Sequence, residues 1–205
     1  MSDKTDTRKQ ILEAAMNRIV HYGYGKTTMS EIASDCCMSA GNIYRFFASK
    51  IDIAEAMARK FNAELYQTYA EMARGPEAPP ERLRKVFFYA LESTFDLIER
   101  DAKILEVAEV LSDERPLFFN EQMAQERIYL CQILEDGVVR GDFAPMEDPN
   151  FIAEMIQTST MKFRFPQLFS RLTLPKLKRE LNGVLDIVIA GLAHGIKVTP
   201  KLNTE

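Results

Sequence analysis

Apolar residues recur every three or four positions along almost the whole chain, and no stretch sustains an alternation of apolar and polar residues. This spacing predicts amphipathic α-helices, whereas alternation would predict strands. Glycine and proline residues interrupt the pattern where turns are needed. Helices are expected at residues 7–22, 51–72, 81–100, 102–112, 120–140, 149–165 and 175–196. The sequence therefore predicts an all-α protein.

The composition fits a globular protein with one large or two small domains. Of the 205 residues, 46% are hydrophobic and 27% are charged, which is usual for such proteins. No apolar run reaches the roughly 18 residues that a membrane-spanning helix needs, and the first ten residues are polar. The three cysteines, two of them adjacent, form no disulfide framework. These features predict a cytoplasmic protein.

Residues 27–50 contain the pattern of two short helices joined by a tight turn. Thr28 can cap the first helix, because Glu31 follows at the spacing of a capping box. Two cysteines end that helix, and Ser39 can cap a second helix over residues 40–45. The segment therefore predicts a helix-turn-helix, in which the second helix enters the major groove of DNA.

The second helix of this motif leaves an unusual set of residues exposed. Ile43, Phe46 and Phe47 are expected to point inward at helical spacing. The outward positions are then Gly41, Asn42, Tyr44 and Arg45. A glycine in this position lets the backbone approach another surface closely. Such a face suits a groove of DNA better than it suits water.

The same segment resembles the DNA-binding motif of the tetracycline-repressor (TetR) family of bacterial transcription regulators. The family pattern has a threonine pair, an Ile-Ala pair, a Ser-x-Gly-x-x-Tyr segment, an aromatic pair and a lysine. The matching residues are Thr27, Thr28, Ile32, Ala33, Ser39, Gly41, Tyr44, Phe46, Phe47 and Lys50. The chain departs from the pattern at the turn, where Cys36, Cys37 and Met38 replace the usual Ala-Gly-Val.

The resemblance implies an all-α architecture with three parts. A three-helix, helix-turn-helix DNA-binding domain would cover residues 1–50, a connecting helix residues 51–74, and a helical-bundle regulatory domain for ligand binding and dimerisation residues 75–205. The implied function is that of a sequence-specific transcription regulator and not of an enzyme. Its usual mode is repression, with a small hydrophobic effector that releases the repressor from an inverted-repeat operator.

The side chains of the motif suit two kinds of DNA contact, because phosphate contacts position a protein and base contacts specify the sequence. Hydroxyls and a cation at helix ends suit phosphates. The residues assigned to phosphates are Thr27, Thr28, Ser39, Tyr44 and Lys50. Asn42 and Arg45 suit the base edges of adenine and guanine. Ala40 can contact a thymine methyl group, and Gly41 allows close approach.

The net charge of −4 is divided unevenly along the chain. Residues 1–62 hold 9 Lys and Arg against 7 Asp and Glu, whereas residues 63–205 hold 17 against 23. A basic face can bind DNA locally while an acidic body stays clear of the phosphates. Uneven charge is also common on solvated helical surfaces, so this contrast alone indicates little.

The resemblance also implies a homodimer, in which the last two long helices pair with those of a second chain as a four-helix bundle. These helices would be residues 149–165 and 175–196. The second of them carries an apolar stripe, and the candidate interface residues are Leu181, Val184, Leu185, Val188 and Leu192. Without the resemblance, a stripe of this kind favours an intramolecular core over a dimer interface.

A regulatory domain of this family needs a ligand cavity, and an aromatic and thioether lining would suit a hydrophobic effector. The candidate ligand-binding residues are Phe88, Phe95, Met123, Tyr129, Gln157 and Met161. Phe and Met at helical spacing are more often ordinary core residues. Lys162 and Arg164 could favour an anionic group or could simply lie exposed.

Other mechanisms stay open at this point. A DNA-binding regulator without a small ligand could be controlled by a protein partner or by oxidation of Cys36 and Cys37. A helical metalloenzyme is disfavoured, because neither His21 nor His194 has a glutamate three residues before it. The cysteines also lack the spacing of a zinc site. The sequence therefore predicts no metal and no cofactor.

Overall fold

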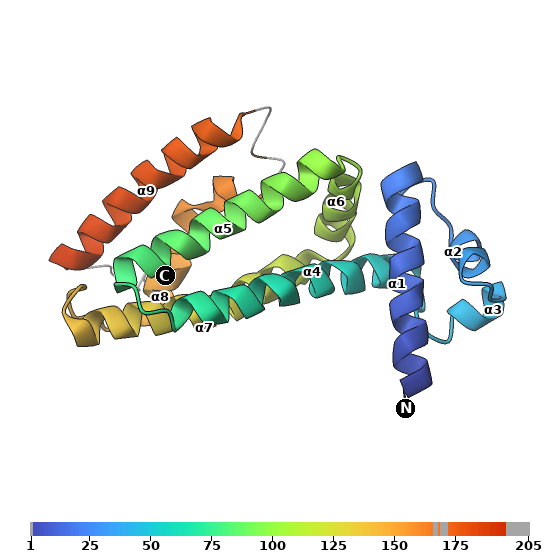
Figure 1. The fold of residues 1–205 in the computed structure, drawn as a ribbon, viewed down its shortest axis with the longest axis horizontal. Helices are drawn as coiled ribbons and strands as arrows, with labels where there is room; N and C mark the ends of the chain where they lie inside the picture. The colour runs from blue at the N-terminus through green and yellow to red at the C-terminus, as the bar shows by residue number, and fades with distance from the viewer. Residues whose placement is uncertain (1, 166–167, 169–171, 196–205) are drawn as a thin grey trace, which may run out of the picture. The chain divides into compact units, whose positions relative to one another are not determined.

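The structure is a computed structural model that describes residues 2–165, 168 and 172–195. Its elements are helices, and no strand occurs in these ranges (Figure 1). The helices are α1 (Ser2–Tyr22), α2 (Met29–Asp35), α3 (Ala40–Ile43), α4 (Lys50–Ala73), α5 (Pro79–Arg100), α6 (Ile104–Glu114), α7 (Pro116–Arg140), α8 (Pro149–Ser159), the 3-10 helix η1 (Met161–Phe163) and α9 (Leu174–His194). The predicted all-α class is confirmed. None of the described helices is long and apolar enough to cross a membrane.

Most helix bounds lie within a few residues of those expected, and the differences have local causes. Helix α7 begins at Pro116 instead of residue 120, because a proline at the first position of a helix loses no internal hydrogen bond. The single helix expected over residues 149–165 is divided at Thr160 between α8 and η1. The expected end of the last helix, at residue 196, lies outside the described residues.

The chain forms two compact units, and neither is continuous in sequence. The N-terminal unit comprises Met1–Glu64 with Asp96–Asn120, and the C-terminal unit comprises Leu65–Phe95 with Glu121–Glu205. The expected linear division placed residues 96–120 with the regulatory domain. In the structure, this segment groups with residues 1–64 in the N-terminal unit.

The core of the N-terminal unit is built from the inward faces of α1, α2, α4 and α6. Its fully buried side chains include Ile11, Ala15, Ile19, Ile32, Ala33, Ile43, Ile53 and Ala54, each at 0% exposure. Val107, Leu111 and Phe118 from the segment 96–120 belong to the same cluster. This shared core holds the short helices α2 and α3, which are too short to be stable alone.

Polar contacts also join α6 and the start of α7 to the rest of the N-terminal unit. The Gly25 N–H donates to Glu106 Oε2 at 3.2 Å. The Arg115 guanidinium donates to Asp52 Oδ1 at 2.8 Å and to Glu55 Oε2 at 3.2 Å, both on α4. These contacts fix the turn before α2 and the first turns of α4 against one segment.

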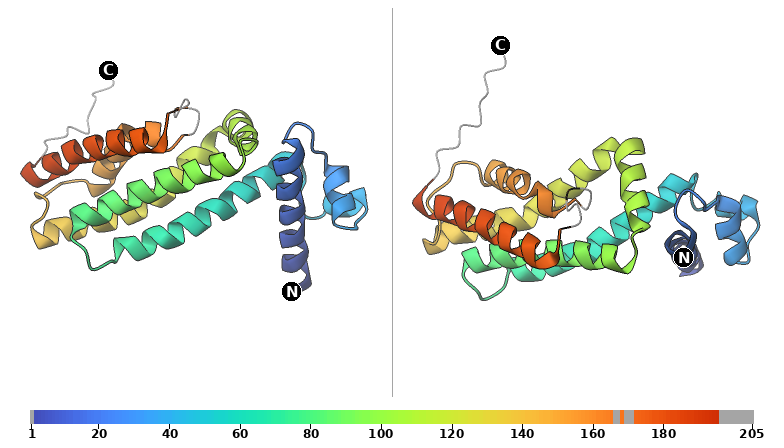
Figure 2. Two further views of the ribbon diagram at one scale, coloured as in Figure 1. Left: turned by 45° about the horizontal axis from the view of Figure 1, so that its top comes forward. Right: turned by 90° about the horizontal axis from the view of Figure 1, so that it is seen from above.

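The C-terminal unit is a bundle of α5, α7, α8 and α9 with the second half of α4. Its central side chains include Leu83, Leu91, Leu130, Ile133, Leu134, Ala153, Leu177, Leu181 and Leu185, all at 0% exposure. Helices α5 and α9 run side by side (Figure 2), and the Arg84 guanidinium donates to Asp186 Oδ1 at 2.5 Å between them. Lys178 and Glu92 form a second pair between the same helices at 2.5 Å.

Candidate DNA-binding site

Helix α2 begins with the capping box that the sequence predicts. The Glu31 N–H donates to Thr28 Oγ1 at 3.3 Å, and the Thr28 N–H donates to Glu31 Oε2 at 2.9 Å. The hydrogen bonds from Thr28 lower the pKa of the Glu31 carboxyl group. Two backbone groups that the helix would otherwise leave unpaired are therefore satisfied at this end.

The turn between α2 and α3 contains the departure from the family pattern. Cys37 has a φ of 55°, in the left-handed region that favours glycine, and it stands where the family usually has glycine. The Met38 N–H donates to the Ala33 carbonyl at 2.9 Å and closes the turn. The turn geometry is thus kept with a residue that adopts this conformation at a cost of roughly 1–2 kcal/mol.

Helix α3 is shorter than predicted, because it covers Ala40–Ile43 and turns replace its expected last residues. Ser39 occupies the N-cap position, but its side chain makes no capping hydrogen bond. Its hydroxyl is therefore not committed to the helix end, in contrast to the capping role expected from sequence. The Phe47 N–H donates to the Ile43 carbonyl at 3.1 Å, so the chain keeps a helical course toward α4.

The side chains of this segment divide between core and surface largely as expected. Ile43 and Phe47 are buried at 0% and 3% exposure, and Phe46 is half-buried. The exposed positions are Ser39, Ala40, Gly41, Tyr44 and Arg45, and Asn42 is half-buried. Tyr44 is 54% exposed, although a tyrosine commonly buries its ring. The segment thus presents a polar face, an aromatic ring and a cation to the outside.

Thr27, one of the residues assigned to a phosphate, has a different role. Its side chain is 0% exposed, and its hydroxyl donates to the Gly23 carbonyl at 2.8 Å. This hydroxyl cannot reach a phosphate without leaving the core, so the prediction for Thr27 is wrong. The residue instead holds the turn that begins at Gly23, whose φ is 92°.

Lys50 also has partners within the N-terminal unit. Its ammonium donates to the carbonyls of Tyr24 and Thr27, each at 2.8 Å, and lies 4.1 Å from the centroid of the Tyr24 ring. Burial lowers the pKa of Lys50, although nearby glutamates act in the opposite direction. Two of its three N–H groups therefore stabilise the turn before α2, and a phosphate contact through the third stays a prediction.

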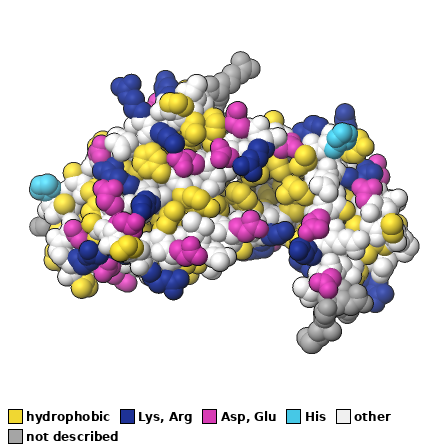
Figure 3. All heavy atoms as spheres, viewed as in Figure 1, with side chains coloured by type: hydrophobic (Ala, Val, Ile, Leu, Met, Phe, Trp, Pro, Cys, Tyr) yellow, Lys and Arg dark blue, Asp and Glu magenta, His cyan; other side chains and the backbone are white. Residues whose placement is uncertain are grey.

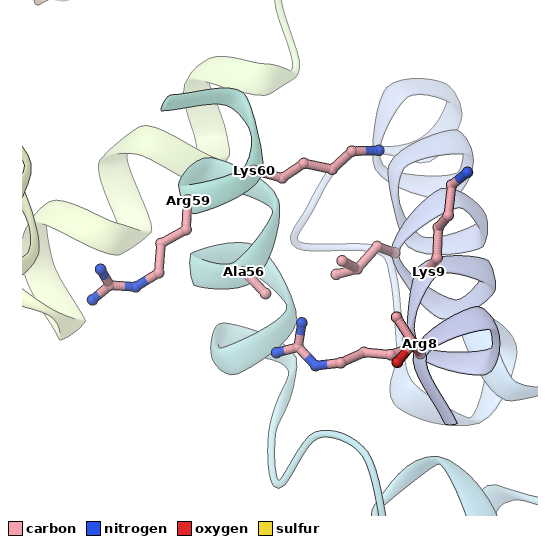
Figure 4. Close-up of a pocket in the computed structure, with 7 residues that line it drawn as sticks. Arg8, Lys9, Ala56, Arg59 and Lys60 are labelled. Atoms are coloured by element: carbon pink, nitrogen blue, oxygen red, sulfur yellow. The ribbon is translucent and has the colours of Figure 1, made fainter. Parts of the chain in front are cut away.

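Basic residues outside the motif line a groove between α1 and α4 (Figure 4). This groove has a volume of about 400 Å³, and the basic residues that line it are Arg8, Lys9, Arg59 and Lys60. The Arg8 guanidinium lies 4.4 Å from the centroid of the Phe47 ring, next to the segment that follows α3. Arg59 donates to Glu55 Oε1 at 2.8 Å, and its guanidinium lies on the side of α4 away from α1.

This groove was not predicted from the sequence, because its lining comes from two helices far apart in sequence. The adjacent cations at positions 8–9 and 59–60 were the available signal. Elsewhere, on the face drawn in Figure 3, basic and acidic side chains are interspersed. This face therefore carries no large patch of one sign of charge.

The thiols of this unit differ in their surroundings. Cys36 is 5% exposed, and burial raises the pKa of its thiol. Cys37 is exposed. A buried thiol with a raised pKa forms little thiolate, so the structure does not favour a redox switch that needs both cysteines. No group of His, Cys, Asp and Glu suited to hold a metal occurs in the described parts of the chain.

Two protein-family models match this chain. The model described as bacterial regulatory proteins, tetR family, matches residues 11–57, which include α2, α3 and the turn between them. The model described as the tetracyclin repressor-like C-terminal domain matches residues 79–185. The second match alone covers more than half of the chain. The chain belongs to the TetR family. It is therefore a transcription regulator and not an enzyme.

Relatives of this TetR-family protein align over most of its length. The transcriptional repressor KstR2 of Mycolicibacterium smegmatis is 28% identical over 164 residues, which cover 78% of each protein. The fatty acid metabolism regulator protein of Bacillus subtilis is 23% identical over 201 residues, 94% of this chain and 98% of that protein. The solved structure of a TetR-family regulator from Pectobacterium atrosepticum has a TM-score of 0.72 at 18% identity, and covers 94% of this chain and 96% of that one.

The structure brings together two of the six candidate ligand-binding residues of this TetR-family chain, Met123 and Gln157. Gln157 is fully buried on α8, and its Nε2 donates to the Met123 carbonyl on α7 at 3.0 Å. Tyr129, also on α7, packs with its ring centroid 6.2 Å from that of Tyr66 and 6.4 Å from that of Tyr69. Phe88, Phe95 and Met161 are half-buried and remain candidates.

A buried ion pair in the C-terminal unit was not expected from sequence. Arg164 and Glu126 form a two-pronged pair, and their side chains are 15% and 2% exposed. Burial acts to lower the pKa of Arg164, and the charge of Glu126 outweighs it, so the pKa is raised. Lys162 pairs with Glu180 at 2.5 Å. Both basic residues therefore have acidic partners within the chain.

The dimer face of α9 predicted from sequence is wrong in part. Leu181 and Leu185 are 0% exposed and Leu192 is 4% exposed, because they pack into the core of their own chain. A partner cannot contact side chains that are already covered. Val184 and Val188 are half-buried. The outward face of α9 instead presents Gly183, Ile187 and Ala190, with Ile187 76% exposed.

Proposed function

We propose that this protein is a transcriptional repressor that binds an inverted-repeat operator as a homodimer and is released by a small hydrophobic effector. The observation that carries the proposal is the face of α3 and the turn after it. Family membership supplies the class of function, because TetR-family repressors bind operator DNA and usually act as dimers.

Base recognition is assigned to Asn42 and Arg45. Arg45 is exposed at the end of α3, where a guanidinium can donate two hydrogen bonds to a guanine. Asn42 is half-buried on the same helix and can pair with an adenine edge. Each good pair of this kind contributes roughly 1–3 kcal/mol of discrimination. Ala40 and Gly41 are exposed beside them and allow the helix to approach the bases.

Phosphate contacts are assigned to Ser39, Tyr44 and Thr28. Ser39 and Tyr44 are exposed at the two ends of α3, and the structure gives the Ser39 hydroxyl no capping role. Thr28 is exposed at the start of α2, where backbone N–H groups favour anions. These contacts would hold the protein in register on the duplex without specifying its sequence.

The homodimer is assigned to the outward face of α9, around Ile187. An exposed aliphatic side chain flanked by Gly183 and Ala190 lets a second helix approach closely. Two recognition helices related by a two-fold axis require half-sites about one turn of DNA apart. A dimer therefore matches an inverted-repeat operator.

The effector is assigned to the C-terminal unit. This unit contains the packed tyrosine rings of residues 66, 69, 89 and 129, of which only Tyr69 is buried, and separately the buried amide of Gln157. Gln157 Oε1 is buried and has no hydrogen-bond partner among the described residues, so an effector that donates a hydrogen bond would satisfy it. A relative is named a fatty acid metabolism regulator, which suits an apolar ligand. Binding would favour a conformation with lower DNA affinity.

The test is selection of binding sites from random duplex DNA with the full-length protein, followed by gel-shift titration of the selected sites. Enrichment of an inverted repeat is expected. Arg45→Ala should relax the base choice at one position in each half-site, whereas Ser39→Ala should weaken binding equally on all sequences. Lys26→Ala is a matched control, because Lys26 is exposed outside α2 and α3. If the folded protein enriches no sequence at low salt, the proposal fails.

A further inference from the structure

A cavity of about 470 Å³ lies within the C-terminal unit, where the end of α4, the start of α5 and α7 meet. Small residues at the end of α4 line one part of it. Its polar lining comes from Arg74, Arg82, Tyr129, Gln132 and Asp136. Tyr129 is the one residue of this lining that was expected from sequence to contact a ligand. Met123 and Gln157 do not line this cavity, so it is distinct from the site assigned to Gln157.

Arg82 is the unusual member of this lining, because its side chain is only 3% exposed. Its Nη1 donates to the Ala73 carbonyl at 2.5 Å, and its Nη2 pairs with the Asp136 carboxylate. The Arg82 Nε has no hydrogen-bond partner in the described structure. A buried N–H without a partner is uncommon, and an acceptor oxygen of a bound molecule would satisfy it.

The charges around the cavity favour an acceptor with one negative charge. The charged residues of the lining are Arg74, Arg82 and Asp136. The Asp136 carboxylate also lies 3.7 Å from Arg140 Nη1. Arg140 in turn lies 3.8 Å from the Asp142 carboxylate. Arg74 Nε donates to the Ala70 carbonyl at 2.9 Å, which leaves its two terminal amino groups for a ligand. The lining itself therefore carries one positive charge in excess.

We propose that this cavity binds the carboxylate of a small monocarboxylic acid, and that this acid is a second regulatory ligand, separate from the hydrogen-bond donor assigned to Gln157. A carboxylate matches the planar fork of a guanidinium, and its single charge matches the excess positive charge of the lining. Its apolar tail would pack against the ring of Tyr129. That the acid regulates DNA binding rests on the proposed function, whereas binding of the acid rests on the cavity alone.

The position of Arg82 indicates how binding would act on the chain. Its guanidinium joins the Ala73 carbonyl on α4 to Asp136 on α7. A ligand carboxylate that accepts from the unpartnered Nε together with Nη2 would compete with Asp136 and weaken this bridge between α4 and α7. Helix α4 is continuous from Lys50, which holds the turn before α2, to Ala73. Ligand binding at one end of this helix is therefore coupled to the DNA-binding motif through one element.

The test uses pairs of compounds that differ only in the acid group. Hexanoate and hexanol, decanoate and decanol, and 4-phenylbutyrate and 4-phenylbutanol are each titrated into the full-length protein, with thermal unfolding and calorimetry as readouts. At least one acid should raise Tm more than its alcohol. Arg74→Gln should weaken that acid about tenfold or more, the scale of one charge-assisted hydrogen bond. Arg179→Gln, an exposed arginine on α9, should leave its affinity unchanged.

Arg82→Lys provides a second variant, because it keeps the charge and removes the fork. Arg82→Lys should lose the preference for the acid over the alcohol even if this variant folds less stably. If Arg82→Lys does not fold, Arg74→Gln still tests the site. The proposal is overturned if every acid and its alcohol shift Tm equally, or if Arg74→Gln binds the acid as tightly as the wild type does.

Release from DNA is measured separately, by adding the bound acid to the complex with the selected operator. Release by an acid that needs Arg74 confirms both the site and its regulatory role. If the acid binds at Arg74 but leaves the DNA complex intact, the site stands and its regulatory role is overturned. If operator selection itself fails, binding of the acid is still measured on the free protein.

Discussion

Replacement of Ile187 by alanine should separate dimer formation from folding. The side chain is 76% exposed in the single chain, on the face of α9 that also presents Gly183 and Ala190. In a dimer through this face, Ile187 would be covered by the partner. Because the side chain contributes little to the core of its own chain, Ile187→Ala should change the free energy of unfolding of the monomer by less than about 0.5 kcal/mol.

The expected effect on dimerisation is much larger. Complete burial of an isoleucine side chain contributes roughly 1.5–3 kcal/mol. Since about three quarters of Ile187 is exposed before association, each copy would contribute roughly 1–2 kcal/mol. A two-fold interface contains both copies. The substitution should therefore weaken the dimer by up to about 2–4 kcal/mol, or roughly 30- to 700-fold in dissociation constant.

Sedimentation equilibrium over a range of protein concentrations would measure this constant. Val139→Ala is the matched control, because Val139 is 85% exposed on α7 of the same unit and lies outside α9. Leu185→Ala should show the opposite behaviour, with a loss of about 2–5 kcal/mol in the free energy of unfolding from its fully buried position. An unchanged dimer constant in Ile187→Ala, or an equal change in Val139→Ala, would refute the assignment of the interface.

Three further predictions concern single residues. Thr28→Ala should cost about 1 kcal/mol in urea unfolding, because it removes the cap of α2. That cap lowers the pKa of Glu31 in the folded protein. The stability that Glu31 contributes should therefore be fully present above its pKa in the unfolded chain, and lost as the pH falls through its pKa in the folded protein. Gly137→Ala should cost about 1–3 kcal/mol in the same assay, because its Cβ would lie 2.1 Å from the Phe143 ring. Cys37 should be alkylated first at neutral pH, as mass spectrometry of the peptides would show, because burial raises the pKa of the other two thiols.

Features that depend on a few neighbouring residues could be predicted from the sequence. The capping box of α2 involves residues three positions apart, and the end of α1 is marked by Gly23 with its φ of 92°. The inward positions of Ile43 and Phe47 follow from helical spacing. In each case the cause lies within one turn of the chain, so the sequence contains the whole argument.

Features that depend on distant residues could not be predicted in this way. The family pattern has a lysine at position 50, but its two carbonyl partners lie 26 and 23 residues earlier. The burial of Thr27 results from the same turn. Periodicity on α9 correctly indicated an apolar face, but it does not say whether that face meets its own chain or a second one. Leu181 and Leu185 meet their own chain.

The segment 96–120 belongs to the N-terminal unit although both of its neighbours in sequence belong to the C-terminal unit. Val107, Leu111 and Phe118 share a core with the helix-turn-helix, and Glu106 receives the N–H of Gly25 in the turn before α2. Arg115 binds two carboxylates on α4 that lie 63 and 60 residues earlier. Residues 96–100 are the last turn of α5 and residues 116–120 the first of α7, so the division between the two units falls within these helices and not at a turn. A division of this kind leaves no glycine or proline signal in the sequence, which is why a linear boundary after residue 74 was expected instead.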